Sequence, residues 1–280
     1  MTRRGYVDVM VRRIGKNLGV FDREMPDASR QLEHDGHAVL RHVFDAGAIT
    51  ALAAEIAQVF ADGPVDARDR EEFRYEMLNR SALAQAAVGN ERILDTIQPL
   101  LGDDCHVIAN TAWRNPPGFA GGPWHCDAGP HVPRPHDVPW DERIPYPVFA
   151  IGAHILLRDC AEHDGPTAVV PGSNRSGRMA PRGHLTDAQL SYDGRPPVLL
   201  TGNAGDVVLF VSDAWHRGTA AGPDGRGRFF LQVHYGRRDI AQRIHTTDHA
   251  HHLSVEALGR AVTPRQRSLV GLHDPYFYDA

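Results

Sequence analysis

Between about residue 104 and residue 236 the chain alternates between short apolar runs and turn-forming residues. Runs such as VFAIGAHILL, DVVLFV and RFFLQVHY are separated by turn sequences such as PPG, DGP and GPDG. Apolar runs of this length predict β-strands when glycine and proline bound them, and several in succession predict a sandwich or a barrel. The 27 glycines and 20 prolines in 280 residues also suit turns and disfavour a helical bundle. We therefore expect a mainly β protein.

Helical periodicity occurs outside this region. Residues 45–62 place apolar side chains at helical spacing behind a candidate cap, Asp45, and residues 81–101 predict two short helices interrupted at Gly89. A polar helix is expected at about 250–268. Because the chain has no internal repeat and no low-complexity linker, we expect a single domain over residues 1–280. It is divided into helical support at about 1–103, a β core at about 104–236 and a C-terminal helical segment at 237–280.

Composition excludes several classes of function. The formal net charge is −5 and no run of four or more basic residues occurs, so we do not expect the chain to bind nucleic acid. Three cysteines without C-x-x-C spacing predict neither a disulfide framework nor a thiolate zinc site, and they suit a reducing compartment. There is no apolar stretch of about 18 residues and no apolar core of a signal peptide. We expect a soluble, cytoplasmic protein that does not bind a membrane; composition does not indicate its oligomeric state.

Seventeen histidines offer many potential metal ligands, so their spacing decides which of them matter. In the segment WHCD, His125 and Asp127 are two residues apart, and on an extended strand both side chains leave the same face. Such a pair also arises by chance, and a histidine at a strand end is more often structural. A third ligand is available if the run GDVVLFVSDAWH delivers His216 to the same sheet interior. Two histidines and one carboxylate on one face of an octahedral ion leave three positions open, the arrangement of non-haem Fe(II) oxygenases.

Five segments, in order along the chain, resemble one protein family. They are HDGHAVLRHVF (34–44), PWHCD (123–127), HDGPTAVVPGSN (163–174), AGDVVLFVSDAWH (204–216) and RGRFFLQVHY (226–235). Together they resemble the phytanoyl-CoA dioxygenase family of Fe(II)- and 2-oxoglutarate-dependent oxygenases. The resemblance implies a double-stranded β-helix (a jelly roll, cupin-like) flanked by helices, which agrees with the strands counted above. It implies that the metal ligands are His125, Asp127 and His216.

The resemblance also implies which residues hold 2-oxoglutarate. Family members use an arginine shortly after the distal histidine to pair with the far carboxylate, because a planar guanidinium suits a carboxylate better than an ammonium does. Arg226 and Arg228 compete for this role. We prefer Arg228, which begins a strand, over Arg226, which falls in the Gly-rich turn. His154 and Asn110 occupy positions comparable to cosubstrate contacts, and Gly218 stands where many relatives carry a small hydroxyl.

The implied activity is hydroxylation of an unactivated C–H bond. In the family, 2-oxoglutarate chelates Fe(II), O2 takes the last position, and oxidative decarboxylation yields succinate and CO2. Asp127 favours hydroxylation over chlorination, since related halogenases replace this carboxylate with a small residue; desaturation, epimerisation and cyclisation stay open. The alternative is a zinc or manganese hydrolase or isomerase that activates water with the same three ligands. A non-catalytic binding or sensor jelly roll is a third possibility.

The expected substrate is a small molecule of natural-product, lipid or amino-acid type. A proline-rich segment, residues 128–147, could form a lid beside the site or be a packed surface loop. Side chains expected on the substrate side are the aromatic Trp124, Trp140 and Tyr146, with Arg134 or Arg143 available for an acidic group. No basic stripe suits a CoA phosphate. The histidine-rich tract at 245–252 is expected to be a surface or lid feature.

Overall fold

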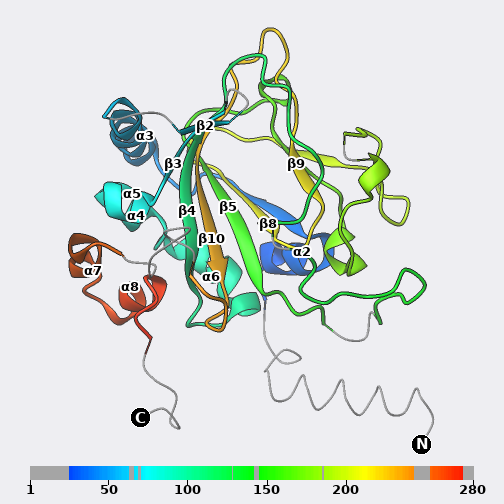
Figure 1. The fold of residues 1–280 in the computed structure, drawn as a ribbon. Coiled ribbons are helices and arrows are strands. Elements are labelled where there is room, and N and C mark those ends of the chain that lie inside the picture. Colours follow the sequence, from blue (N-terminus) through cyan, green and yellow to red (C-terminus); the bar gives the residue numbers. More distant parts are fainter. Residues whose placement is uncertain are drawn as a thin grey trace, which may run out of the picture.

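The computed structural model describes residues 25–62, 66–68, 71–127, 129–141, 145–184, 186–242 and 253–273. These residues form two antiparallel sheets with helices packed against the larger one (Figure 1). The larger sheet has the strand order β1-β8-β5-β10-β4-β3-β2, and the smaller has the order β7-β6-β9. The strands are β1 (His37–Leu40), β2 (Asp66–Arg68), β3 (Glu71–Tyr75), β4 (His106–Arg114), β5 (Ala150–Leu156), β6 (Thr167–Val169), β7 (Val198–Leu200), β8 (Val207–Val211), β9 (His216–Gly218) and β10 (Phe229–Gly236).

The helices confirm the periodicity seen in the sequence. α3 begins after Asp45, whose carboxylate accepts a hydrogen bond from the backbone nitrogen of Ala48 at 2.8 Å. The second helical stretch is interrupted around Gly89, between α5 and α6. The α-helices are α2 (Asp27–Asp35), α3 (Ala46–Ala61), α4 (Met77–Arg80), α5 (Ala82–Ala87), α6 (Glu91–Leu101), α7 (Val255–Arg260) and α8 (Pro264–Leu269), and the 3-10 helices are η1 (Glu162–Asp164), η2 (Ser173–Ser176) and η3 (Arg182–His184). Within the described residues, no helix is both long and apolar enough to cross a membrane.

The central strands of the larger sheet are buried on both faces. On β8, Val207, Leu209 and Val211 pack into the core that the sheet shares with the helices. Val208 and Phe210 point the other way, into an apolar cluster between the two sheets. Alternate side chains therefore belong to different cores, which explains why this strand carries no polar residue. Two facing sheets with helices outside one of them, as Figure 1 shows, form the predicted jelly roll, so the expected fold class is confirmed.

Three strands lie where the sequence predicted helical support. β1 pairs with β8, and β3 and β2 extend the larger sheet beyond β4. The sheet structure is therefore not confined to about 104–236. These strands have three to five residues each, which is too few to show a strand period, and the residues of β2 and β3 are mostly polar.

A buried carboxylate fastens the N-terminal strand to the sheet. The side chain of Asp206, just before β8, is fully buried and accepts hydrogen bonds from the backbone nitrogens of His42 (2.7 Å) and Asn203 (2.9 Å). The guanidinium of Arg41 is a third donor at 2.9 Å. Burial alone would raise the pKa of Asp206, but the three donors outweigh it and lower the pKa below its usual value. The charged carboxylate is thus part of the fold.

On the helix side of the sheet, β10 is fastened by a tyrosine. Tyr235 is fully buried, and its hydroxyl donates a hydrogen bond to the carbonyl oxygen of Val88 at 2.9 Å. Val88 directly follows α5, at the helix terminus where carbonyl groups lack partners within the helix. The tyrosine therefore satisfies a helix terminus while it packs in the core.

Candidate active site

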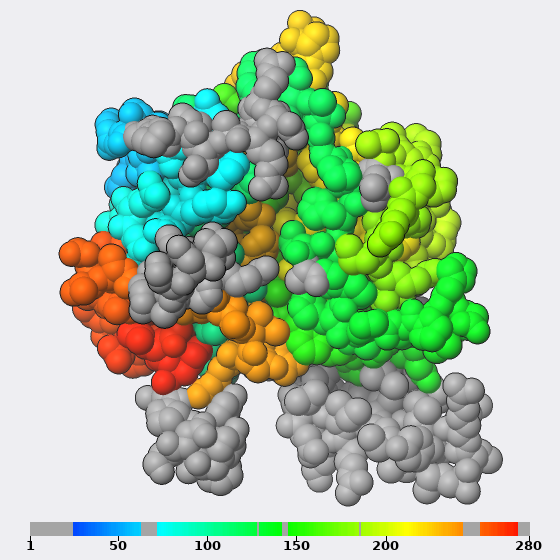
Figure 2. All heavy atoms as spheres, in the orientation of Figure 1, coloured from blue at the N-terminus to red at the C-terminus, as the bar shows by residue number. Residues whose placement is uncertain are grey.

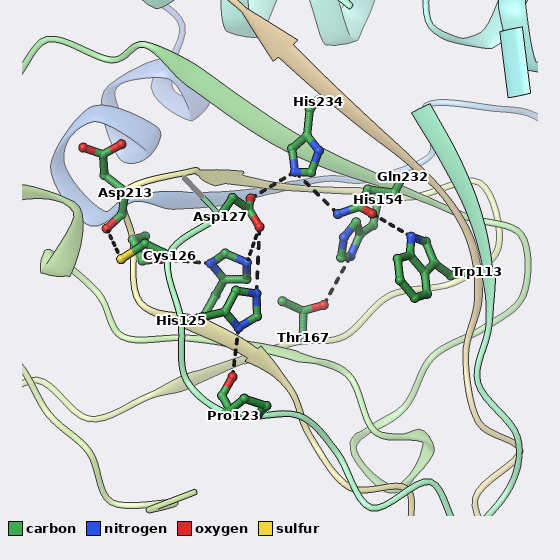
Figure 3. Close-up of polar contacts among 12 residues, drawn as sticks. Trp113, Pro123, His125, Cys126, Asp127, His154, Thr167, Asp213, Gln232 and His234 are labelled. Carbon is green, nitrogen blue, oxygen red and sulfur yellow. Dashed lines mark hydrogen bonds and ion pairs between the residues drawn. The ribbon is translucent and has the colours of Figure 1, made fainter. Parts of the chain in front are cut away.

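The three predicted metal ligands meet in the structure. Figure 3 labels two of them, His125 and Asp127. His216 begins β9 and pairs with His125 by two backbone hydrogen bonds, each 3.0 Å from nitrogen to oxygen. Two residues further on, the backbone nitrogen of Asp127 donates to the carbonyl of Ser212 at 3.1 Å. One ligand atom from each of the three side chains lies within 4.8 Å of the other two. The extended backbone thus places His125 and Asp127 on one face, opposite the strand that supplies His216.

Backbone carbonyls fix the tautomers of both histidines. Nδ1 of His125 lies 2.8 Å from the carbonyl oxygen of Pro123, and Nδ1 of His216 lies 2.9 Å from that of Ala214. A carbonyl oxygen only accepts, so each Nδ1 carries a proton and each neutral ring keeps its lone pair on Nε2. The Nε2 atoms lie 3.8 Å (His125) and 3.3 Å (His216) from Oδ1 of Asp127. Three donor atoms therefore converge as a metal ion requires.

The site holds its carboxylate in the charged form. Burial would raise the pKa of Asp127, but the imidazoles of His216 and His234 outweigh it and lower the pKa well below its usual value. Burial, followed by the proximity of His216, lowers the pKa of His125. Burial would likewise lower the pKa of His216, but the Asp127 carboxylate overcomes this and raises it. Two imidazole nitrogens and one carboxylate oxygen are a donor set that suits Fe(II), zinc or manganese.

A chain of polar side chains runs from Arg228 to His154. Nη1 of Arg228 donates to Oγ1 of Thr167 at 3.0 Å, and the threonine hydroxyl lies 3.2 Å from Nδ1 of His154. Because the oxygen of Thr167 accepts from the arginine, its proton is available to His154. Burial first, and then the charge of Arg228, holds the pKa of His154 well below its usual value, so this ring is neutral and able to accept. Thr167 was not among the site residues predicted from the sequence.

The two candidate arginines lie in different surroundings. Arg228 is only 7 % exposed, and its guanidinium lies 5.0 Å from the ring centroid of Phe230. The side chain of Arg226 is 55 % exposed and lies 3.8 Å from the carboxylate of Asp164, whose other oxygen accepts from the backbone nitrogen of Arg226. The geometry therefore supports Arg228 as the buried cation, whereas the half-exposed Arg226 pairs with the buried carboxylate of Asp164.

Gly218 has a steric reason to lack a side chain. It lies on β9 opposite Thr167, and a Cβ atom at this position would be 2.4 Å from Nη2 of Arg228. The guanidinium therefore occupies the space that a hydroxyl-bearing side chain would need. In this chain the hydroxyl beside the arginine comes from Thr167 of the neighbouring strand.

The family model for phytanoyl-CoA dioxygenase (PhyH) matches residues 32–227, which include His125, Asp127 and His216 and end just before Arg228 and β10. The chain belongs to the phytanoyl-CoA dioxygenase family. A curated relative, the ectoine dioxygenase of Sphingopyxis alaskensis, is 26% identical over 226 residues, which cover 69% of this chain and 71% of the relative.

Solved structures share the fold of this phytanoyl-CoA dioxygenase family member. HygX from Streptomyces hygroscopicus, with nickel, 2-oxoglutarate and hygromycin B bound, is 14% identical with a TM-score of 0.61 and covers 78% of this chain and 90% of that one. The epimerase SnoN, in complex with Fe3+, alpha ketoglutarate and nogalamycin RO, is 17% identical with a TM-score of 0.58 and covers 75% and 82%. At these identities the likeness shows the fold alone.

One strand of this phytanoyl-CoA dioxygenase family member supplies several inward-facing side chains. Phe230 packs between the sheets. Arg228, Gln232 and His234 are an even number of residues away from it along the extended chain, so their side chains also face the space between the sheets. Nε2 of His234 lies 3.0 Å from Oδ2 of Asp127 (Figure 3). His234 was not among the site residues predicted from the sequence, although its even spacing from Arg228 on one predicted strand was a usable signal.

Asn110 does not lie with the side chains that face the space between the two sheets. It lies on β4 opposite Val233, whose side chain packs in the helix-facing core, so the strand register turns Asn110 away from the space between the sheets. Its Nδ2 donates to the carbonyl of Gln232 at 2.9 Å, and its buried Oδ1 has no hydrogen-bond partner among the described residues. Asn110 therefore does not face a cosubstrate held between the sheets. Its predicted role finds no support in the structure.

The aromatic residues expected on the substrate side are partly structural. Trp124 is buried beneath the smaller sheet, and its Nε1 donates to the carbonyl of Asp187 at 2.7 Å. Arg134 donates to the carbonyl of Val138 at 3.1 Å and lies over the ring of Trp140, so it braces its own segment. Arg143 and the histidine-rich tract at 245–252 lie outside the described residues.

A second aspartate ties the proline-rich segment to the connection that carries His216. Asp213 is buried, and its carboxylate accepts from the backbone nitrogen of His131 (2.8 Å) and from the hydroxyl of Tyr146 (2.9 Å). Nδ1 of His131 donates to the same carboxylate. Burial and then the charge of Asp213 raise the pKa of Tyr146, which keeps its proton on the hydroxyl. Tyr146 is thus an anchor of the segment.

Proposed function

We propose that this chain is an Fe(II)- and 2-oxoglutarate-dependent oxygenase that hydroxylates an unactivated C–H bond of a small molecule and releases succinate and CO2. The observation that carries the proposal is a His-Asp-His group together with a buried arginine, Arg228, directly before β10. A zinc or manganese hydrolase or isomerase would use the same three ligands but would have no need for that arginine.

The residues present fit both the metal and the cosubstrate. His125, Asp127 and His216 would hold Fe(II), because imidazole nitrogen and carboxylate oxygen are donors that suit this ion. Arg228 would hold the far carboxylate of 2-oxoglutarate, because a guanidinium pairs bidentately with a carboxylate and gains strength where water is excluded. When bound, these groups supply the oxidative chemistry, in which decarboxylation of 2-oxoglutarate provides electrons for the reduction of O2.

The protein itself orients the ligands and borders His216 with apolar surface. The carbonyls of Pro123 and Ala214 hold the two ligand imidazoles with Nε2 free, and Thr167 holds the guanidinium of Arg228 in place. The buried ring of Phe210 lies 4.5 Å from that of His216 between centroids, so apolar surface, not water, borders the ligands on this side. Imidazoles and a guanidinium that are held in fixed orientations can position a cosubstrate for reaction.

The proposed substrate is a small molecule of natural-product, lipid or amino-acid type. The relatives support this class: ectoine dioxygenase is named for a small molecule, and HygX and SnoN were solved with hygromycin B and nogalamycin RO. Asp127 supports hydroxylation, because it keeps a carboxylate where related halogenases have a small residue. Since SnoN is an epimerase on the same fold, the product has to be identified chemically.

The first test is anaerobic addition of Fe(II) and 2-oxoglutarate to the protein, followed by visible absorption. We expect a weak charge-transfer band that needs both additions and disappears in His216→Ala. In Arg228→Gln the band should need a higher concentration of 2-oxoglutarate, because the cosubstrate binds more weakly. The matched variant Arg226→Gln should need the same concentration as the wild type. Absence of the band from the wild-type protein would refute the proposal. Succinate release across a library of small molecules would then identify the substrate.

A further inference from the structure

We infer that His234 is a positioning residue that holds the second oxygen of Asp127, so that this carboxylate binds the metal through one oxygen only. The inference rests on the proposed function, because it concerns how a ligand of the iron is held. Neither the metal-ligand spacing nor the family motifs assign a role to this histidine.

The two oxygens of Asp127 have different neighbours. Oδ1 faces the other ligands, at 3.3 Å from Nε2 of His216 and 3.8 Å from Nε2 of His125. Oδ2 lies 3.0 Å from Nε2 of His234. Among the described residues, the ligand atoms that lie within 4.8 Å of one another come from His125, Asp127 and His216, without His234. His234 therefore sits beyond the carboxylate and contacts the oxygen turned away from the other ligands.

The contact with Asp127 determines where His234 carries its proton. A carboxylate oxygen only accepts, so Nε2 of His234 must be the donor. The amide nitrogen of Gln232 lies 3.5 Å from the same atom, and it is also a donor, because the oxygen of that amide accepts from Nε1 of Trp113 at 2.6 Å. Two donors do not bond to each other, and the charged carboxylate is the stronger partner. The proton of Nε2 is thus directed at Oδ2.

Packing keeps the imidazole in this position. His234 is 9 % exposed and lies on β10 between β4 and β5, opposite Gly152 of β5. A side chain at Gly152 would collide with the ring of Phe210, which occupies that space and lies 6.5 Å from the His234 ring, edge to face. A donor that is fixed by its surroundings can orient a ligand without losing much conformational entropy.

Holding Oδ2 has a consequence for coordination. An octahedral ion bound by two imidazoles and one carboxylate oxygen keeps three positions for exogenous groups. If both oxygens of Asp127 bound the ion, one of those positions would be lost. Because a chelating 2-oxoglutarate and O2 together need three positions, His234 keeps the number of open positions matched to the chemistry.

The test measures anaerobic binding of Fe(II) by titration calorimetry, and of Mn(II) by the loss of its free-ion electron paramagnetic resonance signal. The variants are His234→Leu, which removes the donor, and His234→Gln, whose amide can again donate to Oδ2. We expect His234→Leu to weaken metal binding about 10- to 100-fold and His234→Gln to recover most of this loss. His106→Leu is the matched control. It removes a buried imidazole from β4 of the same sheet, which bonds to Ile240 and His273 rather than to a ligand, and it should bind the metal as the wild type does.

Each outcome decides between two explanations. Wild-type affinity in His234→Leu, or equal losses in His234→Leu and His234→Gln, would overturn the role of His234. If His234→Leu does not fold, His234→Met, which keeps the volume without a donor, takes its place. If the wild type itself binds metal no better than His216→Ala, the proposed function fails and the comparison at His234 no longer applies.

Discussion

Replacing Gly218 by alanine should weaken binding of 2-oxoglutarate without removing any polar group. The new Cβ would lie 2.4 Å from Nη2 of Arg228, whereas ordinary contacts begin at 3.4 Å, so the guanidinium must withdraw by about 1 Å. A shift of that size misaligns a charge-assisted pair with the cosubstrate carboxylate. Such bonds contribute about 1.5–3 kcal/mol, so we expect the Kd of 2-oxoglutarate to rise about 10- to 100-fold.

The assay is a titration of 2-oxoglutarate into anaerobic Fe(II)-loaded protein, followed by the charge-transfer band. Gly122→Ala is the matched control, since Gly122 bonds to the carbonyl of Gly218 and a Cβ there would meet nothing within 4 Å. Metal affinity should be unchanged in both variants, because neither glycine contacts a ligand. An unchanged Kd for 2-oxoglutarate in Gly218→Ala would show that Arg228 does not hold the cosubstrate from its observed position.

Three further predictions concern stability, measured by urea unfolding. Asp206→Asn should cost about 3 kcal/mol, because an amide replaces one accepting oxygen of a buried carboxylate that holds three donors. Tyr235→Phe should cost about 1 kcal/mol, because the carbonyl of Val88 loses its buried donor; a neutral result would show that water replaces it. Burial lowers the pKa of His106 and His154, so the unfolded chain takes up protons at higher pH than the folded one. Stability should therefore fall as the pH drops below about 6.5, and His106→Gln should reduce this fall; a pH-independent stability would contradict the reasoning.

The strands that the sequence predicted are those with strong local signals. β5, β8 and β10 are apolar on both faces because helices cover one side of the sheet and the second sheet covers the other. β1, β2 and β3 were missed because their pairing with distant strands, not their own composition, makes them strands.

The metal ligands were predictable because two of them are two residues apart on an extended segment and the third ends an apolar run. Thr167 was not, because its contact with Arg228 joins residues that are 61 positions apart. Asn110 was assigned to the cosubstrate pocket, but the register of β4 against β10 turns it to the other face. A register is set by pairing across the sheet, and a shift of one residue reverses every side chain, so sequence alone does not determine it.

The three hydrogen bonds to Asp213 bear on how this protein could change its substrate. They fix the proline-rich segment at His131 and at Tyr146, and between these points the backbone nitrogen of Arg134 donates to the carbonyl of Gly177 at 3.0 Å. Asp213 lies in the connection that carries His216, so losing these attachments would disturb a metal ligand as well as the segment. A segment transplanted from a relative to change the substrate would therefore have to keep the partners of Asp213 at positions 131 and 146.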